Sequence, residues 1–298
     1  MDPKVMGICA ALGSAASWAV GSILFKRLGE SLSSPAMTLV KEIVSVVLLA
    51  AALALVGFQG LDRQSLLLLV VSGLLGIALG DTFFFRALQD LGPLALVLLM
   101  TLGQVLTVVL AVIFLGDRPT PAAWGGMALV VGGVTVVLYA RVAGDSGASG
   151  LRGIVFGLLS VLCMSFSMIV AKKGLDSVSA IEATFIRTLS GAAGMLLFGL
   201  GSGRLGKWIV PLRDVRLLAS FLVAVTVVTF GGFWLSLVAV KHLDVSIANA
   251  LNSSEPVFIL PLAAVFLKEA VSRKALLGTV LTVAGVTLLC LLIPNSFP

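Results

Sequence analysis

The chain is a succession of long apolar runs separated by short polar connectors. A helix needs about 20 apolar residues to cross the hydrocarbon core of a bilayer. The segment 93–115, for instance, has this length and contains no charged residue. Treating each run as a helix bounded by Pro, Gly or polar residues predicts ten membrane spans. The predicted spans are residues 5–25, 35–57, 64–88, 93–115, 121–139, 151–171, 179–200, 215–240, 245–267 and 272–293.

The pattern repeats after five spans. At an offset of 146 residues Lys41 aligns with Arg187, and at an offset of 152 residues Gly126 aligns with Gly278. Because five is odd, the second set of spans starts on the opposite side of the membrane, which predicts an inverted repeat of the kind found in transporters. The predicted units are a first five-helix repeat over residues 1–143, a linker over 144–150 and a second, inverted repeat over 151–298.

The composition supports an all-α membrane protein. Of the 298 residues, 59% are hydrophobic and 11% are charged, and the mean hydropathy is +1.16. A water-soluble domain does not hide so much apolar surface. The net charge of +6 comes from single basic residues in connectors, so no basic face predicts nucleic-acid binding. The three cysteines are scattered through apolar runs and predict no metal site.

The distribution of basic residues predicts the orientation in the membrane. Twelve Lys and Arg residues fall on the side opposite the two termini, and six fall on the side of the termini. Basic residues favour the cytoplasmic side, so both termini are predicted to lie outside the cytoplasm of a cell (inner) membrane protein. The six residues are Lys4, Arg63, Arg118, Lys172, Lys173 and Lys241.

The stretch "GSGRLGKWIVP", residues 201–211, satisfies two nucleotide-binding patterns but predicts no nucleotide site. Both patterns need a preceding strand in a soluble α/β unit. Here the stretch joins two predicted spans, and Lys207 is followed by Trp208 instead of a Ser or Thr. His242 is the single histidine, and no nucleophile motif is present, so neither an enzyme nor a cofactor is predicted.

Two polar stripes cross the second and seventh spans. Thr38, Lys41 and Glu42 share one helix face, and Thr184 and Arg187 repeat the pattern. A charge inside a membrane is costly and faces a cavity or a partner. The stripes therefore predict substrate contacts or alternating gates. The alternatives are a Lys41–Glu42 pair, or cations that extend to the headgroups.

The ninth span carries the densest polar cluster, "NALNSSEP". Asn249, Asn252 and Ser253 are candidate substrate ligands, and Asn252 and Glu255 are helical neighbours that can contact one ligand. Pro256 is predicted to kink the helix and to free the Asn252 carbonyl. A membrane-embedded glutamate suits proton coupling, with a hydrogen-bonded structural role as the alternative.

Asp81 in the third span is the second candidate for proton coupling. It follows Gly73, Gly76 and Gly80, which predict a small-residue face that another helix approaches closely. Asp81 is expected either to line the transport pathway or to pair with Arg86.

Trp18 in the first span aligns with Met164 in the sixth. Both lie on faces rich in Ser, Gly or Cys. The two side chains are candidate substrate contacts, and packing between helices is the alternative for either one.

The ends of the fourth and ninth spans carry a family resemblance. The ordered pair "FLGDRPTPAAWGG" and "FLKEAVSRKALLG", followed by "GGVTVVL" and "AGVTLLC", resembles the EamA family of the drug/metabolite transporter superfamily. The resemblance implies alternating access with a site between two halves, and export of amino acids or other small metabolites. Where the second half has Glu255 and Pro256, as family members often do, the first half has Gly103 and Gln104.

These observations predict a secondary active transporter that exports amino acids or similar small polar metabolites. Its expected partners are a small-molecule substrate, protons and membrane lipids. One alternative is a carrier for drugs or organic cations, with Glu255 and Asp81 as counter-charges. A second alternative is a lipid-handling protein or flippase with a cavity open to the acyl chains.

Overall fold

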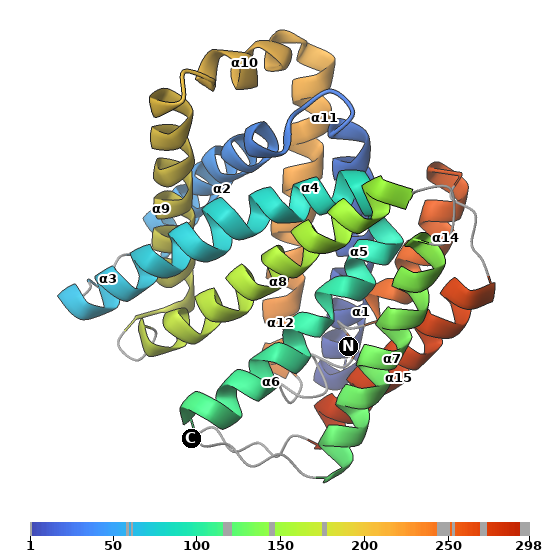
Figure 1. Cartoon of the computed structure of the whole chain (residues 1–298). Coiled ribbons are helices and arrows are strands. Elements are labelled where there is room, and N and C mark those ends of the chain that lie inside the picture. The colour runs from blue at the N-terminus through green and yellow to red at the C-terminus, as the bar shows by residue number, and fades with distance from the viewer. Residues whose placement is uncertain are drawn as a thin grey trace.

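A computed structural model describes residues 2–57, 60, 62–115, 121–142, 147–174, 178–242, 251, 254–268 and 273–292. Within these ranges the chain is helical and contains no strand (Figure 1). The helices of the first half are α1 (Pro3–Leu28), α2 (Ser34–Val56), α3 (Arg63–Ser72), the π-helix η1 (Gly73–Gly80), α4 (Asp81–Leu91), α5 (Pro93–Met100), α6 (Leu102–Leu115) and α7 (Pro121–Val142).

The second half is also helical where it is described. It comprises α8 (Gly147–Gly174), α9 (Ala180–Gly201), the short α10 (Leu205–Ile209), the 3-10 helix η2 (Val210–Arg213), α11 (Val215–Thr226), the π-helix η3 (Val227–Trp234), α12 (Leu235–His242), α14 (Glu255–Phe266) and α15 (Arg273–Leu292).

Six described helices are long and apolar enough to cross a membrane, and they coincide with the predicted first, second, third, sixth, seventh and eighth spans. The predicted fourth span is broken at Thr101 into α5 and α6. Residues 245–250, 252 and 253 of the predicted ninth span lie outside the described residues. The count of ten spans therefore stays a prediction, as does the 144–150 linker, of which residues 144–146 are not described.

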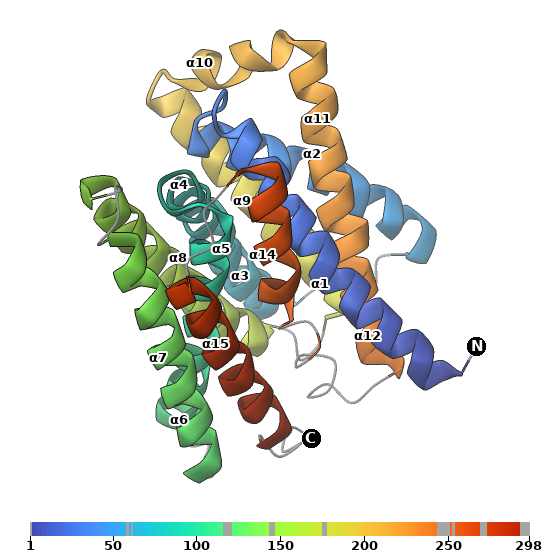
Figure 2. The same ribbon diagram turned by 90° about the vertical axis from the view of Figure 1, so that its right-hand side faces the viewer.

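The first helix of each half packs against the other half. α1 contacts α11, η3, α12 and α14, all from the second half of the chain (Figure 2). In the same way α8 contacts α3, η1, α4 and α6 from the first half (Figure 1). The two halves are interlocked by this exchange.

Among the described residues, two large apolar clusters hold the bundle together, beside two smaller ones. One is centred on α5, whose residues Leu94, Ala95, Val97, Leu98 and Leu99 are buried together with residues of α7, α14 and α15. The other joins α1, α2, α4 and α11, where Phe25 makes edge-on contacts with Phe85 and Phe221 at centroid distances of 5.1 and 5.7 Å. The polar groups described below lie between α2, α4, α8 and α9.

α7 and α15 pack with backbone almost touching backbone (Figure 2). A Cβ atom on Gly133 would lie 2.5 Å from the carbonyl oxygen of Gly278, and one on Gly285 would lie 2.7 Å from that of Gly126. The earlier glycine of each helix thus faces the later glycine of the other, so the two helices run antiparallel. Small residues permit such an approach, as in membrane helix pairs generally.

This contact yields a matched pair of test substitutions. Gly133→Ala is expected to lower stability in detergent by roughly 1–3 kcal/mol, because the added methyl group meets the backbone of α15. Gly132→Ala is the control, since a Cβ at Gly132 meets nothing within 4 Å. Its melting temperature is expected to stay unchanged or to rise slightly. Equal melting temperatures for the two variants would contradict the close contact.

Candidate functional site

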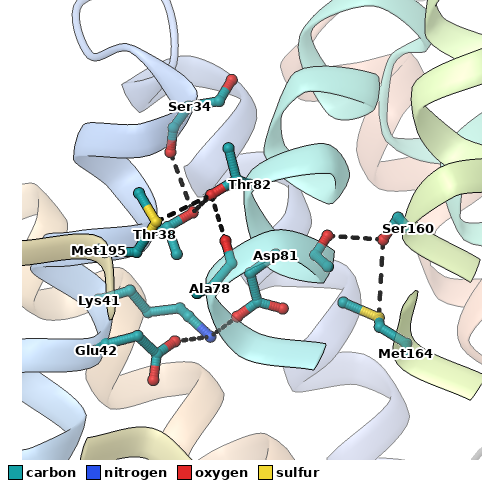
Figure 3. A network of polar contacts seen from close by, with 11 residues as sticks. Ser34, Thr38, Lys41, Glu42, Ala78, Asp81, Thr82, Ser160, Met164 and Met195 are labelled. Carbon is teal, nitrogen blue, oxygen red and sulfur yellow. Dashed lines mark hydrogen bonds and ion pairs between the residues drawn. The ribbon is translucent and has the colours of Figure 1, made fainter. Parts of the chain in front are cut away.

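A cluster of charged side chains lies between α2 and α4 (Figure 3). The Nζ atom of Lys41 lies 2.5 Å from Oδ2 of Asp81 and 2.6 Å from Oε1 of Glu42. The side chains are 20%, 14% and 2% exposed, respectively. Lys41 therefore forms an ion pair with Glu42, which was the alternative to substrate contact. It also forms an ion pair with Asp81. Asp81 does not pair with Arg86, which lies 3.5 Å from Asp90 instead.

Arg187 adds a second cation to this cluster from α9. Asp81 and Glu42 both attract its guanidinium electrostatically. The Nη2 atom of Arg187 also donates to Oγ of Ser167 on α8 over 3.1 Å. With Lys41, the cluster holds two cations and two carboxylates and has a formal charge of zero.

The π-helix η1 brings α4, α8 and α9 together around Asp81. Its Gly73 meets the backbone of Arg187, and its Gly76 meets Ser167. Any larger residue at either glycine would clash, so the predicted small-residue face is confirmed. Asp81 is the residue directly after this π-helix. π-helices are rare in proteins, and those that occur are often found at functional sites.

Hydroxyl groups continue the network above the ion pair (Figure 3). The hydroxyl of Thr82 donates to the carbonyl of Ala78 over 2.6 Å, and its oxygen lies 3.1 Å from Oγ1 of Thr38. Thr38 donates to the carbonyl of Ser34, one turn earlier in α2. These contacts link α2 to the segment that carries Asp81.

Two repeat-related serines bind the two π-helices. Ser160 of α8 donates to the carbonyl of Gly80 in η1 over 2.9 Å (Figure 3), and Ser14 of α1 donates to the carbonyl of Gly232 in η3 over 2.7 Å. Because a π-turn does not pair its carbonyls in the i to i+4 pattern, an external hydroxyl is a useful partner. Each half thus supplies a serine that binds the π-helix of the other half.

The remaining predicted residues divide between packing positions and positions outside the cluster. Trp18 packs against Gly232 in η3, and Met164 packs against Gly80 in η1. Both side chains therefore pack between helices, which was the alternative to substrate contact. Substrate contact stays a prediction for each. Thr184 lies on an exposed part of α9, unlike the buried Thr188 on the same helix.

The polar cluster of the predicted ninth span is described only in part. Asn249, Asn252 and Ser253 lie outside the described residues. Glu255 is the first residue of α14. Pro256 occupies the first turn, where its missing N–H group leaves no helical hydrogen bond unmade. The kink at Pro256 stays a prediction, whereas Pro261 lies inside α14 and was not singled out in the sequence.

Sequence reasoning also missed a serine pair. The hydroxyls of Ser72 and Ser167 lie 2.9 Å apart, and each side chain donates to the other residue's carbonyl group over 2.8 Å. Isolated serines in apolar runs are common, so spacing gives no signal of this pair. Within the described residues, no group of three or more His, Cys, Asp or Glu residues is arranged to hold a metal ion.

A double-mutant cycle tests the central ion pair. Lys41→Met leaves two buried carboxylates without their main counter-charge and is expected to destabilise the protein by about 3–5 kcal/mol. Combining it with Asp81→Asn is expected to recover part of that loss, with a coupling energy of about 1–3 kcal/mol. The measurement is the free energy of unfolding in mixed detergent micelles.

The control is the ion pair between Arg152 and Asp90, which joins α8 to α4 with contacts of 2.7 and 2.8 Å. The Arg152 side chain is 51% exposed, so water screens this pair and its coupling energy is expected to be much smaller. A Lys41–Asp81 coupling no larger than that of the control would contradict the proposed tight pairing.

Comparison with known proteins places this arrangement in a family. No curated protein sequence matches the chain. A solved structure described as "Crystal structure of protein" has a TM-score of 0.61 and 18% sequence identity, over 99% of this chain and 98% of its own, and so shares the fold. The profile of the EamA-like transporter family matches residues 5–139 and again residues 151–291. These two matches cover most of the chain, and the protein therefore belongs to the EamA-like transporter family, a family of membrane transporters in the drug/metabolite transporter superfamily.

Proposed function

We propose that this membrane transporter exports amino acids or similar small polar metabolites, and that the cluster of Lys41, Glu42, Asp81 and Arg187 binds the substrate. The observation that carries the proposal is the charge balance of the cluster, which holds two cations and two carboxylates in the middle of apolar helices. Membrane-embedded charges of this kind mark substrate or ion pathways.

A balanced cluster suits a zwitterion. The planar fork of Arg187 matches a substrate carboxylate, and the oxygens of Asp81 and Glu42 match a substrate ammonium group. An organic cation without an acidic group would meet Lys41 and Arg187 with no compensating anion of its own. The charge balance therefore favours amino acids over the organic-cation alternative.

Asp81 also offers a route to proton coupling. Its carboxylate is paired with Lys41 at 2.5 Å, and a proton bound to Asp81 would remove one of the two negative charges that hold Lys41. Lys41 would then keep Glu42 as a partner and could bind a substrate carboxylate in place of Asp81. In the proposal, Glu255 at the start of α14 is the second proton-binding group, and the proton or substrate gradient drives transport.

Alternating access between two inverted repeats completes the proposal. The antiparallel contact between α7 and α15 supports it. In the repeat, Gly126 and Gly133 align with Gly278 and Gly285, but in the structure Gly126 lies against Gly285 and Gly133 lies against Gly278. The exchange of α1 and α8 between the halves supports it as well. The cell (inner) membrane, with both termini outside the cytoplasm, is the location in this proposal, on the basis of the Lys and Arg distribution.

Ligand binding is the first test of the proposal. Purified protein is heated with amino acids, sugar phosphates, nucleosides or organic cations at two pH values. An amino acid at about 100 times its Kd is expected to stabilise the folded protein by about 2–3 kcal/mol. Arg187→Lys keeps the charge but loses the fork, and it is expected to weaken this shift strongly.

Arg204→Lys is the matched control, because Arg204 is exposed on the connector before α10. Its amino-acid response is expected to equal that of the wild type. A shift with organic cations alone would overturn the amino-acid proposal in favour of a cation carrier. A shift with lipids alone would favour a lipid-handling protein.

Proton coupling is tested by transport in liposomes with an imposed pH gradient. Asp81→Asn and Glu255→Gln each remove one proton-binding group, and each is expected to abolish the dependence of uptake on the gradient while counterflow exchange of substrate persists. Asp90→Asn, in the last turn of α4 and outside the cluster, is expected to keep the dependence. Unchanged pH dependence in Glu255→Gln would remove Glu255 from the coupling role.

A further inference from the structure

A pocket of about 330 Å³ opens between the end of α1 and the start of α11. It lies away from Lys41 and Asp81 and plays no part in the function proposed above. The lining residues are Leu24, Arg27 and Leu28 from α1, and Asp214, Arg216, Leu217 and Ser220 from the start of α11.

The pocket lies where two membrane spans end. Arg27 is in the last turn of α1, and Arg216 is in the first turn of α11. Both side chains are exposed, and the sequence places both on the side of the membrane with more basic residues. This is the level of lipid headgroups, where the negative surface potential of anionic lipids acts on basic side chains.

The two arginines leave donors for an anion. A guanidinium has five N–H donors, and among the described residues the hydrogen bonds of Arg27 use one, from Nη2 to the carbonyl of Phe266 over 2.7 Å. The Arg216 side chain has no hydrogen bond or ion pair within the described ranges. Asp214 is the acid in the pocket, and its carboxylate accepts the backbone N–H of Arg216 over 2.8 Å. The pocket therefore has one excess positive charge.

The rest of the pocket is apolar. Leu28 is buried at its base, and Leu24 and Leu217 are half-buried along its sides. Ser220, one turn after Arg216, also lines the pocket, and its hydroxyl donates to the carbonyl of Arg216 over 2.9 Å. Cationic donors at the membrane surface above an aliphatic wall match a molecule that is anionic at one end and apolar at the other.

We propose that this pocket binds the headgroup of an anionic phospholipid, with Arg27 and Arg216 contacting its phosphate and Leu24 and Leu217 contacting the start of its acyl chains. A freely soluble anion would use the arginines but would gain nothing from the leucines. Since α1 and α11 belong to different halves of the chain, the bound lipid bridges the two halves.

The test is native mass spectrometry of the full-length protein titrated with palmitoyl-oleoyl phosphatidylglycerol. The double variant Arg27→Gln/Arg216→Gln is expected to lower the affinity of the first bound lipid about tenfold or more. Arg204→Gln/Lys207→Gln removes the same charge from exposed positions on the adjoining surface and is expected to change the affinity less than about twofold. An equal loss in both double variants would overturn the proposal, because it would show general surface attraction.

Two further measurements test lipid binding without the arginine variant, in case that variant is unstable. Leu217→Trp fills the apolar side without altering the charge, and it is expected to weaken phosphatidylglycerol binding as well. Palmitoyl-oleoyl phosphatidylcholine, which has the same chains and no net charge, is expected to bind more weakly to the wild type. Equal binding of the two lipids, or displacement of the lipid by excess inorganic phosphate, would overturn the lipid assignment.

Discussion

The cost of holding charges among apolar helices governs this structure. Lys41, Asp81 and Glu42 are acceptable inside the bundle because each is within ion-pair distance of an opposite charge or is attracted by one. That requirement fixes the rotation of α2 and α4 relative to each other. Helix α9 is placed by the same requirement, because Arg187 must remain near the two carboxylates. The packing of α2, α4 and α9 thus follows from one set of neutralised charges.

Small residues make this neutralisation possible. Gly73 and Gly76 let the backbone of α9 and the Ser167 side chain of α8 approach the π-helix that precedes Asp81. A bulkier residue would move Arg187 away from the acidic groups. The serines contribute in the same region, since the hydroxyls of Ser72 and Ser167 satisfy backbone carbonyls that would otherwise face apolar side chains. Close helix packing and the hydrogen bonding of buried carbonyls therefore occur in the same few helical turns around Ser72 and Gly76.

Much of the fold was predictable because hydrophobic thickness sets span length, and polar residues in register reveal the repeat. The inward face of Lys41 was also predictable from helical spacing. Its pairing with Asp81 was not, because it depends on helix rotation and on the π-helix η1, which departs from the 3.6-residue period used to assign faces. The break at Thr101 was missed because neither proline nor glycine occupies that position. The sequence stretch around Asn252 lies beyond the described residues, so its role stays a prediction.

The exchange of α1 and α8 has a consequence for how such a protein arises and folds. Ser14 and Ser160 each complete a π-helix that belongs to the other half. A half-length chain made alone would present a groove suited to the first helix of a second copy. Two such half-length chains would therefore pair by exchanging their first helices reciprocally, as the two halves do here. During synthesis, likewise, α1 has its contacts with α4 and α5 early, but its partners α11, η3, α12 and α14 follow only with the second half.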